Sequence, residues 1–191
     1  RRLRAKAWMK LEEYDRAIED YTGLIRITAG TEFEWAEAYS LRAWVYSEKG
    51  EFDSALKDID LAINKKPSTP EFFNLRGLIY RKEDPNKAIM YYEEAIRLRP
   101  GYAEATLSLG ILYTSQELFI EAGILYTQVL AGSSKSHVAY NNRGYVCYKM
   151  GRYREAEEGL SRAIELKDDY DKAYINRSFV RQAPAWATMP D

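Results

Sequence analysis

The 191-residue chain has few of the residues on which disulfides and metal centres depend. Cys147 is its only cysteine and His137 its only histidine, so an intrachain disulfide or a cysteine-based metal site cannot form. A single cysteine is compatible with a reducing compartment, and we therefore expect a cytoplasmic protein. The chain begins at Arg1 without an initiator Met, which suggests that the natural N-terminus is missing.

The chain also lacks an excess of charge of one sign and a long apolar run. Its 28 Lys and Arg are balanced by 29 Asp and Glu, a net charge of −1, and the two signs alternate along the chain. This pattern is typical of a solvated surface and indicates no nucleic-acid partner. No run approaches the roughly 20 apolar residues that a membrane span needs, so we expect no membrane insertion.

Signals for catalysis are weak as well. No glycine-rich phosphate-binding loop is present. Adjacent glutamates such as Glu93 and Glu94 are expected on outer helix faces, where they are solvated charge rather than an acid–base couple. We therefore predict no catalytic residue, no cofactor, no metal, and a protein that is not an enzyme.

What the chain does contain is an internal repeat. An alanine recurs at intervals of 38, 33, 34 and 34 residues: Ala17, Ala55, Ala88, Ala122 and Ala156. Four of the five have an aromatic residue three positions earlier, as in "YDRA", "FDSA", "FIEA" and "YREA", and Ala88 has Pro85 there. A small residue upstream recurs in parallel, at intervals of 38, 34, 33, 34 and 34 residues: Ala5, Ala43, Gly77, Gly110, Gly144 and Ser178. Two independent series with one period indicate a true repeat.

Each unit is predicted to be two helices joined by a turn. Gly50 and Gly151 suit a left-handed helix end, and Pro85 suits the first turn of a new helix. The small residue in the first helix allows a neighbouring helix to approach, and the large residue four positions after the alanine in the second helix fills the gap. We call these residues, together with the residue three positions after the small one in the first helix, the packing stripe. Cys147 is one of them, so we expect a buried structural thiol.

This pattern resembles the tetratricopeptide repeat (TPR) family. The best match is "AYNNRGYVCYKMGRYREAEEGLSRAIELKDD", with Tyr140, Gly144, Gly151, Tyr153 and Ala156 at signature places. The resemblance implies an all-α fold: a right-handed superhelix, or α-solenoid, of stacked antiparallel helix hairpins, with five repeats plus one extra helix. It predicts a solenoid over residues 1–183, with repeats at about 1–31, 36–69, 70–102, 103–136 and 137–170, a lone helix at 171–183, and a non-repeat tail at 184–191.

The first helices carry a second stripe beside the packing stripe. It consists of the residue directly after each small one, and five of its six members are large and apolar: Lys6, Trp44, Leu78, Ile111, Tyr145 and Phe179. A helix needs one apolar stripe to join a core, so the second is available for a partner. The alternative is that these residues, like Leu41, Leu75 and Leu107, pack between adjacent helices.

The resemblance implies that first helices line the concave side of the superhelix, so we expect a groove that binds a peptide or helix of another protein. The predicted contacts are Trp44, Leu78, Ile111, Tyr145, Tyr148, Phe179, Asn74, Asn141, Asn142, Asn176 and Lys172. The asparagine amides would hydrogen-bond the ligand. Asn142, Lys172 and Asn176 fall at three places of the clamp with which some TPR domains bind the acidic tails of Hsp70 and Hsp90. Leu107 and Ile111 replace its Lys and Asn, which disfavours that ligand.

We therefore predict a non-catalytic scaffold or adaptor. Two other classes stay open, a targeting or regulatory TPR module of a larger enzyme and a structural spacer in an assembly. The tail "APAWATMPD" could cover the last helix or self-associate with another copy through Trp186 and Met189. The sequence identifies neither the partner nor the pathway.

Overall fold

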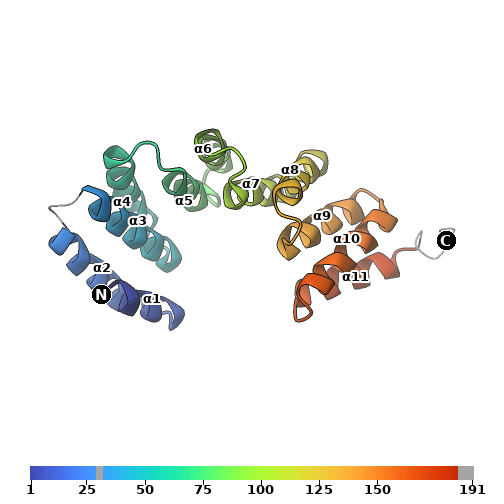
Figure 1. The fold of residues 1–191 in the computed structure, drawn as a ribbon, viewed down its shortest axis with the longest axis horizontal. Coiled ribbons are helices and arrows are strands. Elements are labelled where there is room, and N and C mark those ends of the chain that lie inside the picture. Colours follow the sequence, from blue (N-terminus) through green and yellow to red (C-terminus); the bar gives the residue numbers. More distant parts are fainter. Residues whose placement is uncertain (29–31, 185–191) are drawn as a thin grey trace. The chain divides into compact units, whose positions relative to one another are not determined.

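The structure, a computed structural model, describes residues 1–28 and 32–184. All regular secondary structure in these residues is helical (Figure 1). The chain divides into two compact units, Arg1–Pro100 and Gly101–Asp191. The first unit contains α1 (Arg2–Lys10), α2 (Tyr14–Thr28), α3 (Glu32–Lys49), α4 (Phe52–Lys65), α5 (Pro70–Tyr80) and α6 (Pro85–Leu98). The second contains α7 (Ala103–Ser115), α8 (Phe119–Gly132), α9 (His137–Lys149), α10 (Tyr153–Leu166) and α11 (Asp171–Gln182).

Within each unit, consecutive helices pack as pairs, and each pair packs on the next. In the first unit the pairs are α1 with α2, α3 with α4, and α5 with α6, and α2 and α4 also contact the helix that follows them. In the second unit α7 pairs with α8 and α9 with α10, while α11 packs against α9 and α10. We call α1, α3, α5, α7, α9 and α11 the first helices and the others the second helices. Such neighbour-to-neighbour packing is what a solenoid requires.

The predicted packing stripe is buried at the alanines and at the large residues of the second helices, whereas Ser178 on α11 is exposed and Tyr46, Tyr80 and Tyr113 are partly buried. All five repeating alanines of the second helices have no exposed surface. The residues four positions later are also fully or almost fully buried: Tyr21, Ile59, Tyr92, Tyr126 and Leu160. Each large buried side chain of this kind contributes roughly 1.5–3 kcal/mol to folding. The prediction from the repeat period is therefore confirmed by burial for the second helices.

The small residues of the first helices are small because a second helix approaches them closely. A methyl group added at Gly110 would lie 2.7 Å from Cε1 of Tyr126, and one added at Gly144 would lie 2.7 Å from Cγ of Leu160. Real Cβ atoms do not come this close to a neighbouring carbon. The glycine and the large residue of the next helix therefore form a matched pair.

One buried position escaped the sequence analysis. The residue two places after five of the six small ones is an aliphatic side chain with at most 4 % exposure: Val45, Ile79, Leu112, Val146 and Val180. Val45 joins the cluster around Tyr21, and Val146 joins the cluster around Tyr126. Each of these two therefore packs on the hairpin that precedes its own helix. The run of Val, Ile and Leu at one repeat position was the available signal.

The turns within hairpins follow the predicted chemistry in most repeats. Gly50 and Gly151 adopt left-handed backbone with φ of 86° and 74°. Pro85 begins α6, and the Asp84 carboxylate caps that helix by accepting a hydrogen bond from the Lys87 amide at 3.1 Å. At the equivalent positions of two other repeats, Glu12 and Glu117 hold φ of 58° and 62°. These two glutamates adopt a conformation that suits glycine better.

The helix that opens the second repeat begins before residue 36, the predicted start of that repeat. This helix, α3, begins at Glu32 and runs for 18 residues. The last helix, α11, ends at Gln182. The predicted contacts of Trp186 and Met189 lie outside the described residues. No helix in the described ranges is long and apolar enough to cross a membrane.

Candidate functional site

The second stripe lies at the surface of the first helices. Trp44 on α3 is 37 % exposed, Ile111 on α7 is 41 % exposed and Phe179 on α11 is 45 % exposed. Leu78 on α5 and Tyr145 on α9 are partly buried, and Lys6 on α1 is exposed. None of these side chains is enclosed in the core, although the residues on either side of each stripe position are mostly buried. These apolar surfaces are accessible to a ligand.

In the first unit, Trp44 separates two hollows. The larger hollow, about 590 Å³, lies toward α1 and is lined by Lys6, Met9, Lys10, Glu12, Tyr14, Leu41, Trp44 and Glu48. The smaller, about 200 Å³, lies toward α5 and is lined by Trp44, Ser47, Glu48, Phe52, Leu75, Leu78, Ile79, Arg81 and Lys82. Trp44 and Glu48 border both hollows, so the two are adjacent. Together they have the size at which proteins hold ligand side chains.

Asn74 on α5 is half-buried near the centre of the first unit. Its carboxamide oxygen is buried and has no hydrogen-bond partner among the described residues. An unsatisfied buried acceptor costs about 1–3 kcal/mol. An N–H donor that reached this oxygen would therefore gain more than an ordinary surface hydrogen bond provides.

In the second unit, aromatic rings of two first helices come together. The rings of Tyr148 on α9 and Phe179 on α11 stack with centroids 6.4 Å apart and an angle of 24° between their planes. Ile175, one helical turn before Phe179, is 53 % exposed. This side of the second unit therefore presents aromatic and aliphatic surface.

The predicted asparagines of the second unit bond to one another. The Asn176 amide donates to Oδ1 of Asn141 at 2.9 Å, and the Asn141 amide donates to Oδ1 of Asn142 at 3.1 Å. Asn141 is only 3 % exposed, so its side chain joins α9 to α11 and is not accessible to a ligand. Asn142 and Asn176 are partly buried, and Lys172 is exposed. Of the predicted polar contacts in this unit, only Asn142, Asn176 and Lys172 are accessible at the surface.

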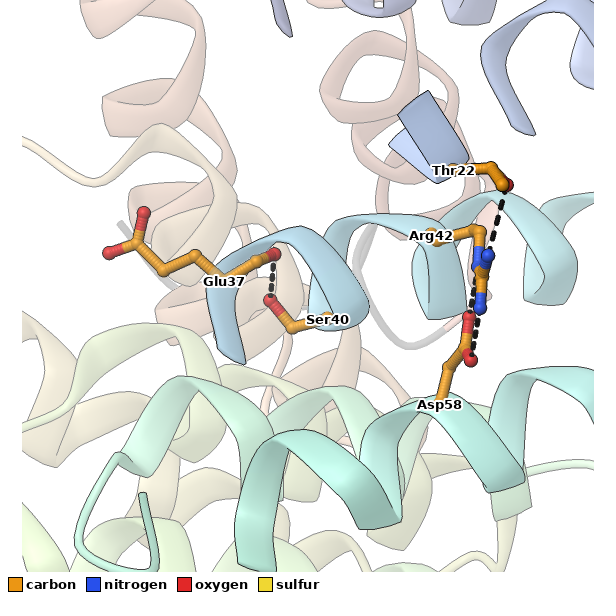
Figure 2. Close-up of polar contacts among 5 residues, drawn as sticks. All are labelled: Thr22, Glu37, Ser40, Arg42 and Asp58. Atoms are coloured by element: carbon orange, nitrogen blue, oxygen red, sulfur yellow. Dashed lines mark hydrogen bonds and ion pairs between the residues drawn. The ribbon is translucent and has the colours of Figure 1, made fainter. Parts of the chain in front are cut away.

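Arginine stands directly before the small residue in five of the six first helices, and we call these residues the arginine row: Arg4, Arg42, Arg76, Arg143 and Arg177. Arg42 lies directly before the small residue Ala43, where the family often has Leu. Its guanidinium donates to both carboxylate oxygens of Asp58 on α4, at 2.6 and 2.8 Å, and to Oγ1 of Thr22 on α2 at 2.9 Å (Figure 2). Ser40, two residues earlier, donates only to the Glu37 carbonyl at 2.9 Å (Figure 2). Arg42 therefore connects two successive hairpins.

Other repeats use the same place with different partners. Arg4 donates to Asp20 on α2, and these hydrogen bonds hold the pKa of the Asp20 carboxyl below its ordinary value. Arg76 lies 3.0 Å from Oδ1 of Asp60 on α4, with its guanidinium 4.6 Å from the centre of the Tyr91 ring. The sequence signal was an arginine followed sixteen residues later by aspartate in the first two repeats. Arg4, Arg42 and Arg76 thus join helices of the first unit through ion pairs with aspartates.

Neither Cys147 nor His137 has the surroundings of a reactive group. Cys147 is 5 % exposed, and burial raises the pKa of its thiol. His137 begins α9, and its ring meets the edge of Tyr170 at 4.9 Å between centroids. No group of three or more His, Cys, Asp or Glu in the described ranges is arranged to hold a metal ion.

Several curated proteins are similar to this chain at low sequence identity. Tetratricopeptide repeat protein 13 of Homo sapiens is 27 % identical over 167 residues, which are 84 % of this chain and 19 % of that protein. The UDP-N-acetylglucosamine–peptide N-acetylglucosaminyltransferase of Giardia intestinalis is 24 % identical over 104 residues, 54 % of this chain and 7 % of that protein. The chain thus spans a minor part of the curated relatives that it matches.

Solved structures share the fold over most of the chain. YrrB, described as a TPR protein with an unusual peptide-binding site, has a TM-score of 0.65 at 22 % identity, covering 91 % of this chain and 88 % of YrrB. A thermophilic TPR protein of Thermus thermophilus, TTC0263, has a TM-score of 0.74 at 18 % identity, covering 94 % of this chain and 96 % of that one. Both are TPR proteins, so the fold is that of a TPR α-solenoid.

Sequence models described as "Tetratricopeptide repeat" match residues 36–69, 80–137 and 137–170. The chain belongs to the tetratricopeptide repeat family.

Proposed function

We propose that this chain is a non-catalytic adaptor that binds a peptide or helix of a partner protein along the second stripe of its first helices. The observation that carries the proposal is the exposure of Trp44, Ile111 and Phe179 on helices that already pack through other residues, the buried Val45, Leu112 and Val180 among them. A protein that exposes large apolar side chains at the same position of several repeats usually uses them for a partner. YrrB, which shares the fold, is described as having a peptide-binding site.

The expected affinity is modest. Trp44, Leu78, Ile111 and Tyr145 would each contribute roughly 1.5–3 kcal/mol when covered by a ligand. Association costs about 4–15 kcal/mol in lost freedom, which offsets most of this gain. With the gain at about 12 kcal/mol and the cost at about 4 kcal/mol, the net is about −8 kcal/mol, a dissociation constant around micromolar, which is the upper bound on the affinity from these four side chains. Asn74, Asn142, Asn176 and Lys172 would add polar contacts that select among apolar ligands.

The test replaces one stripe residue in each unit. The double variant Trp44→Ala/Tyr145→Ala is compared with Met90→Ala/Ile120→Ala, which removes large apolar side chains that are 64 % and 69 % exposed on second helices. Partners are recovered by affinity purification, identified by mass spectrometry, and the strongest is purified for binding measurements. We expect W44A/Y145A to weaken its binding at least tenfold, about 1.4 kcal/mol. M90A/I120A should leave it unchanged.

Two results would reject the proposal. One is unchanged affinity in a W44A/Y145A protein that circular dichroism shows to be folded. The other is an equal loss in both double variants, which would assign binding to the second helices or to the molecule as a whole.

A second candidate function is a targeting module within a larger enzyme. It is favoured by two relatives whose names describe transferases and of which the chain spans 7 % and 11 %. A catalytic activity found in the full-length gene product and absent from this chain would support it. In either case we propose a cytoplasmic location, on the basis of the single cysteine.

A further inference from the structure

We propose that the surface around Trp44 selects acidic protein segments, in which one apolar side chain lies on the indole and carboxylates lie on both sides of it. This inference rests on the binding function proposed above and adds the chemistry of the ligand. It concerns only the first unit, whose two hollows meet at Trp44.

The apolar requirement follows from what lines the hollows. Met9, Tyr14 and Leu41 extend the apolar surface from Trp44 toward α1, and Leu75 and Leu78 extend it toward α5. Trp44 between them is 37 % exposed. A Phe, Leu or Met side chain of the ligand would be covered on several sides there, which is the arrangement in which apolar burial contributes most.

The acidic requirement follows from unpaired cations at both outer edges. Lys6 and Lys10 line the hollow toward α1, and Arg81 and Lys82 line the hollow toward α5. None of the four makes an ion pair within the described ranges. By contrast, Arg42 and Arg76, on α3 and α5, are paired with Asp58 and Asp60. The arginines on the opposite face of these helices are neutralised by aspartates, whereas the four cations around Trp44 are not, so the Trp44 surface carries free positive charge.

The two acids in the hollows define where the ligand charge must lie. Glu48 borders both hollows and Glu12 lies in the larger one, so the lining carries four positive and two negative side chains. Lys6 and Lys10 outnumber Glu12 in the hollow toward α1, Arg81 and Lys82 lie toward α5, and Glu48 lies between the two, beside Trp44. A ligand with carboxylates at its ends and an uncharged apolar centre matches this order.

The same order disfavours single-stranded nucleic acid, although bases also stack on tryptophan. A nucleic acid would place a phosphate near Glu48, because its charges follow one another without a gap. A protein segment can leave the centre uncharged. The net charge of −1 on the whole chain likewise gives no long-range attraction for a polyanion.

The test uses the complete chain and three synthetic fluorescein-labelled peptides of about ten residues, a length that spans roughly 33–36 Å when extended. The first has Asp and Glu on both sides of one central Phe. The second has Asn and Gln in place of the acids. The third keeps the acids and replaces Phe with Ser. Binding is followed by fluorescence anisotropy. Unlabelled oligothymidylate, a single-stranded nucleic acid, is added as a competitor.

We expect the acidic Phe peptide to bind at least fivefold more tightly than either relative, and its affinity to fall at about 1 M salt, where the Debye length is near 3 Å. Lys6→Glu/Lys82→Glu should weaken it about fivefold or more. The matched control Lys57→Glu/Lys135→Glu, with the same change of charge at lysines outside the hollows, should leave it unchanged.

Four results would overturn the inference. If the neutral peptide binds as well as the acidic one, the surface does not select charge, and the proposed adaptor function is unaffected. If K57E/K135E weakens binding as much as K6E/K82E, the effect is one of net charge alone. If no peptide binds, or if oligothymidylate binds more tightly than the acidic Phe peptide, the ligand class is wrong. Only the W44A/Y145A experiment with a purified partner tests the adaptor function itself.

Discussion

The close approach of Gly110 to Tyr126 predicts opposite effects for one substitution at two glycines of the second unit. Gly110 lies in α7 and Gly123 in α8, and neither is at a helix end. Alanine at either position should gain about 0.5–1 kcal/mol, because glycine is the more flexible residue in the unfolded chain. The two sites differ in what the added methyl group would meet.

At Gly110 the methyl group would meet a side chain that cannot move aside easily. It would lie 2.7, 3.0 and 3.2 Å from Cε1, Cζ and Cδ1 of Tyr126. The Tyr126 ring is 1 % exposed, and its hydroxyl hydrogen-bonds Oγ1 of Thr114 at 3.0 Å. Overpacking of this kind costs about 1–3 kcal/mol. At Gly123 the nearest atom outside its own helix is Cγ1 of Val146 at 3.8 Å, an ordinary contact.

We therefore expect Gly123→Ala to be slightly more stable than the parent chain and Gly110→Ala to be less stable than Gly123→Ala by about 1–3 kcal/mol. The measurement is urea unfolding followed by circular dichroism, and a thermal scan should show a difference of about 2–4 °C for each kcal/mol. Equal stability of the two variants would refute the reasoning. It would mean that the hairpins adjust their separation freely and that the small-residue series is not set by the large residue of the next helix.

Two further predictions concern the interior of the stack. Arg42→Ala leaves the Asp58 carboxylate buried without its ion pair, so we expect the free energy of unfolding in urea to fall by about 3 kcal/mol. The control Arg97→Ala removes an exposed pair with Glu94 and should change that free energy little. A loss in R42A as small as that in R97A would contradict this. The Cys147 thiol, buried and with a raised pKa, should react with a thiol reagent only in denaturant; stoichiometric labelling of the native chain within seconds would show that α9 does not protect it.

Much of the fold was predictable because the repeat period compares the chain with itself. The alanine series and the residue four places later were identified as core from spacing alone, and the structure buries each of them. Gly50 and Gly151 were assigned correctly to helix ends, since only glycine is comfortable with positive φ. The position two places after the small residue was missed because an aliphatic side chain at one place in a helix does not reveal which neighbour it contacts.

The candidate site was less predictable, because surface and interior positions alternate within a single helical turn. Trp44 and Tyr145 occupy the same repeat position, yet the first is more exposed than the second. Asn141 fits the pattern of a surface amide, but the structure uses it to join α9 and α11. Side-chain burial at this level depends on the size of the neighbouring residues, which a periodic pattern does not encode.

The arginine row shows why the two faces of a first helix can have separate tasks. Arg42 and Trp44 are two residues apart on α3, so their side chains point about 200° apart around the helix axis. Arg42 is held by Asp58 and Thr22, and that polar contact fixes α3 between its neighbours without using the Trp44 side. An apolar residue at position 42 would pack there as well. Arg42 binds Asp58 and Thr22 on the neighbouring helices, and the Trp44 indole on the other side of α3 is free to contact a ligand.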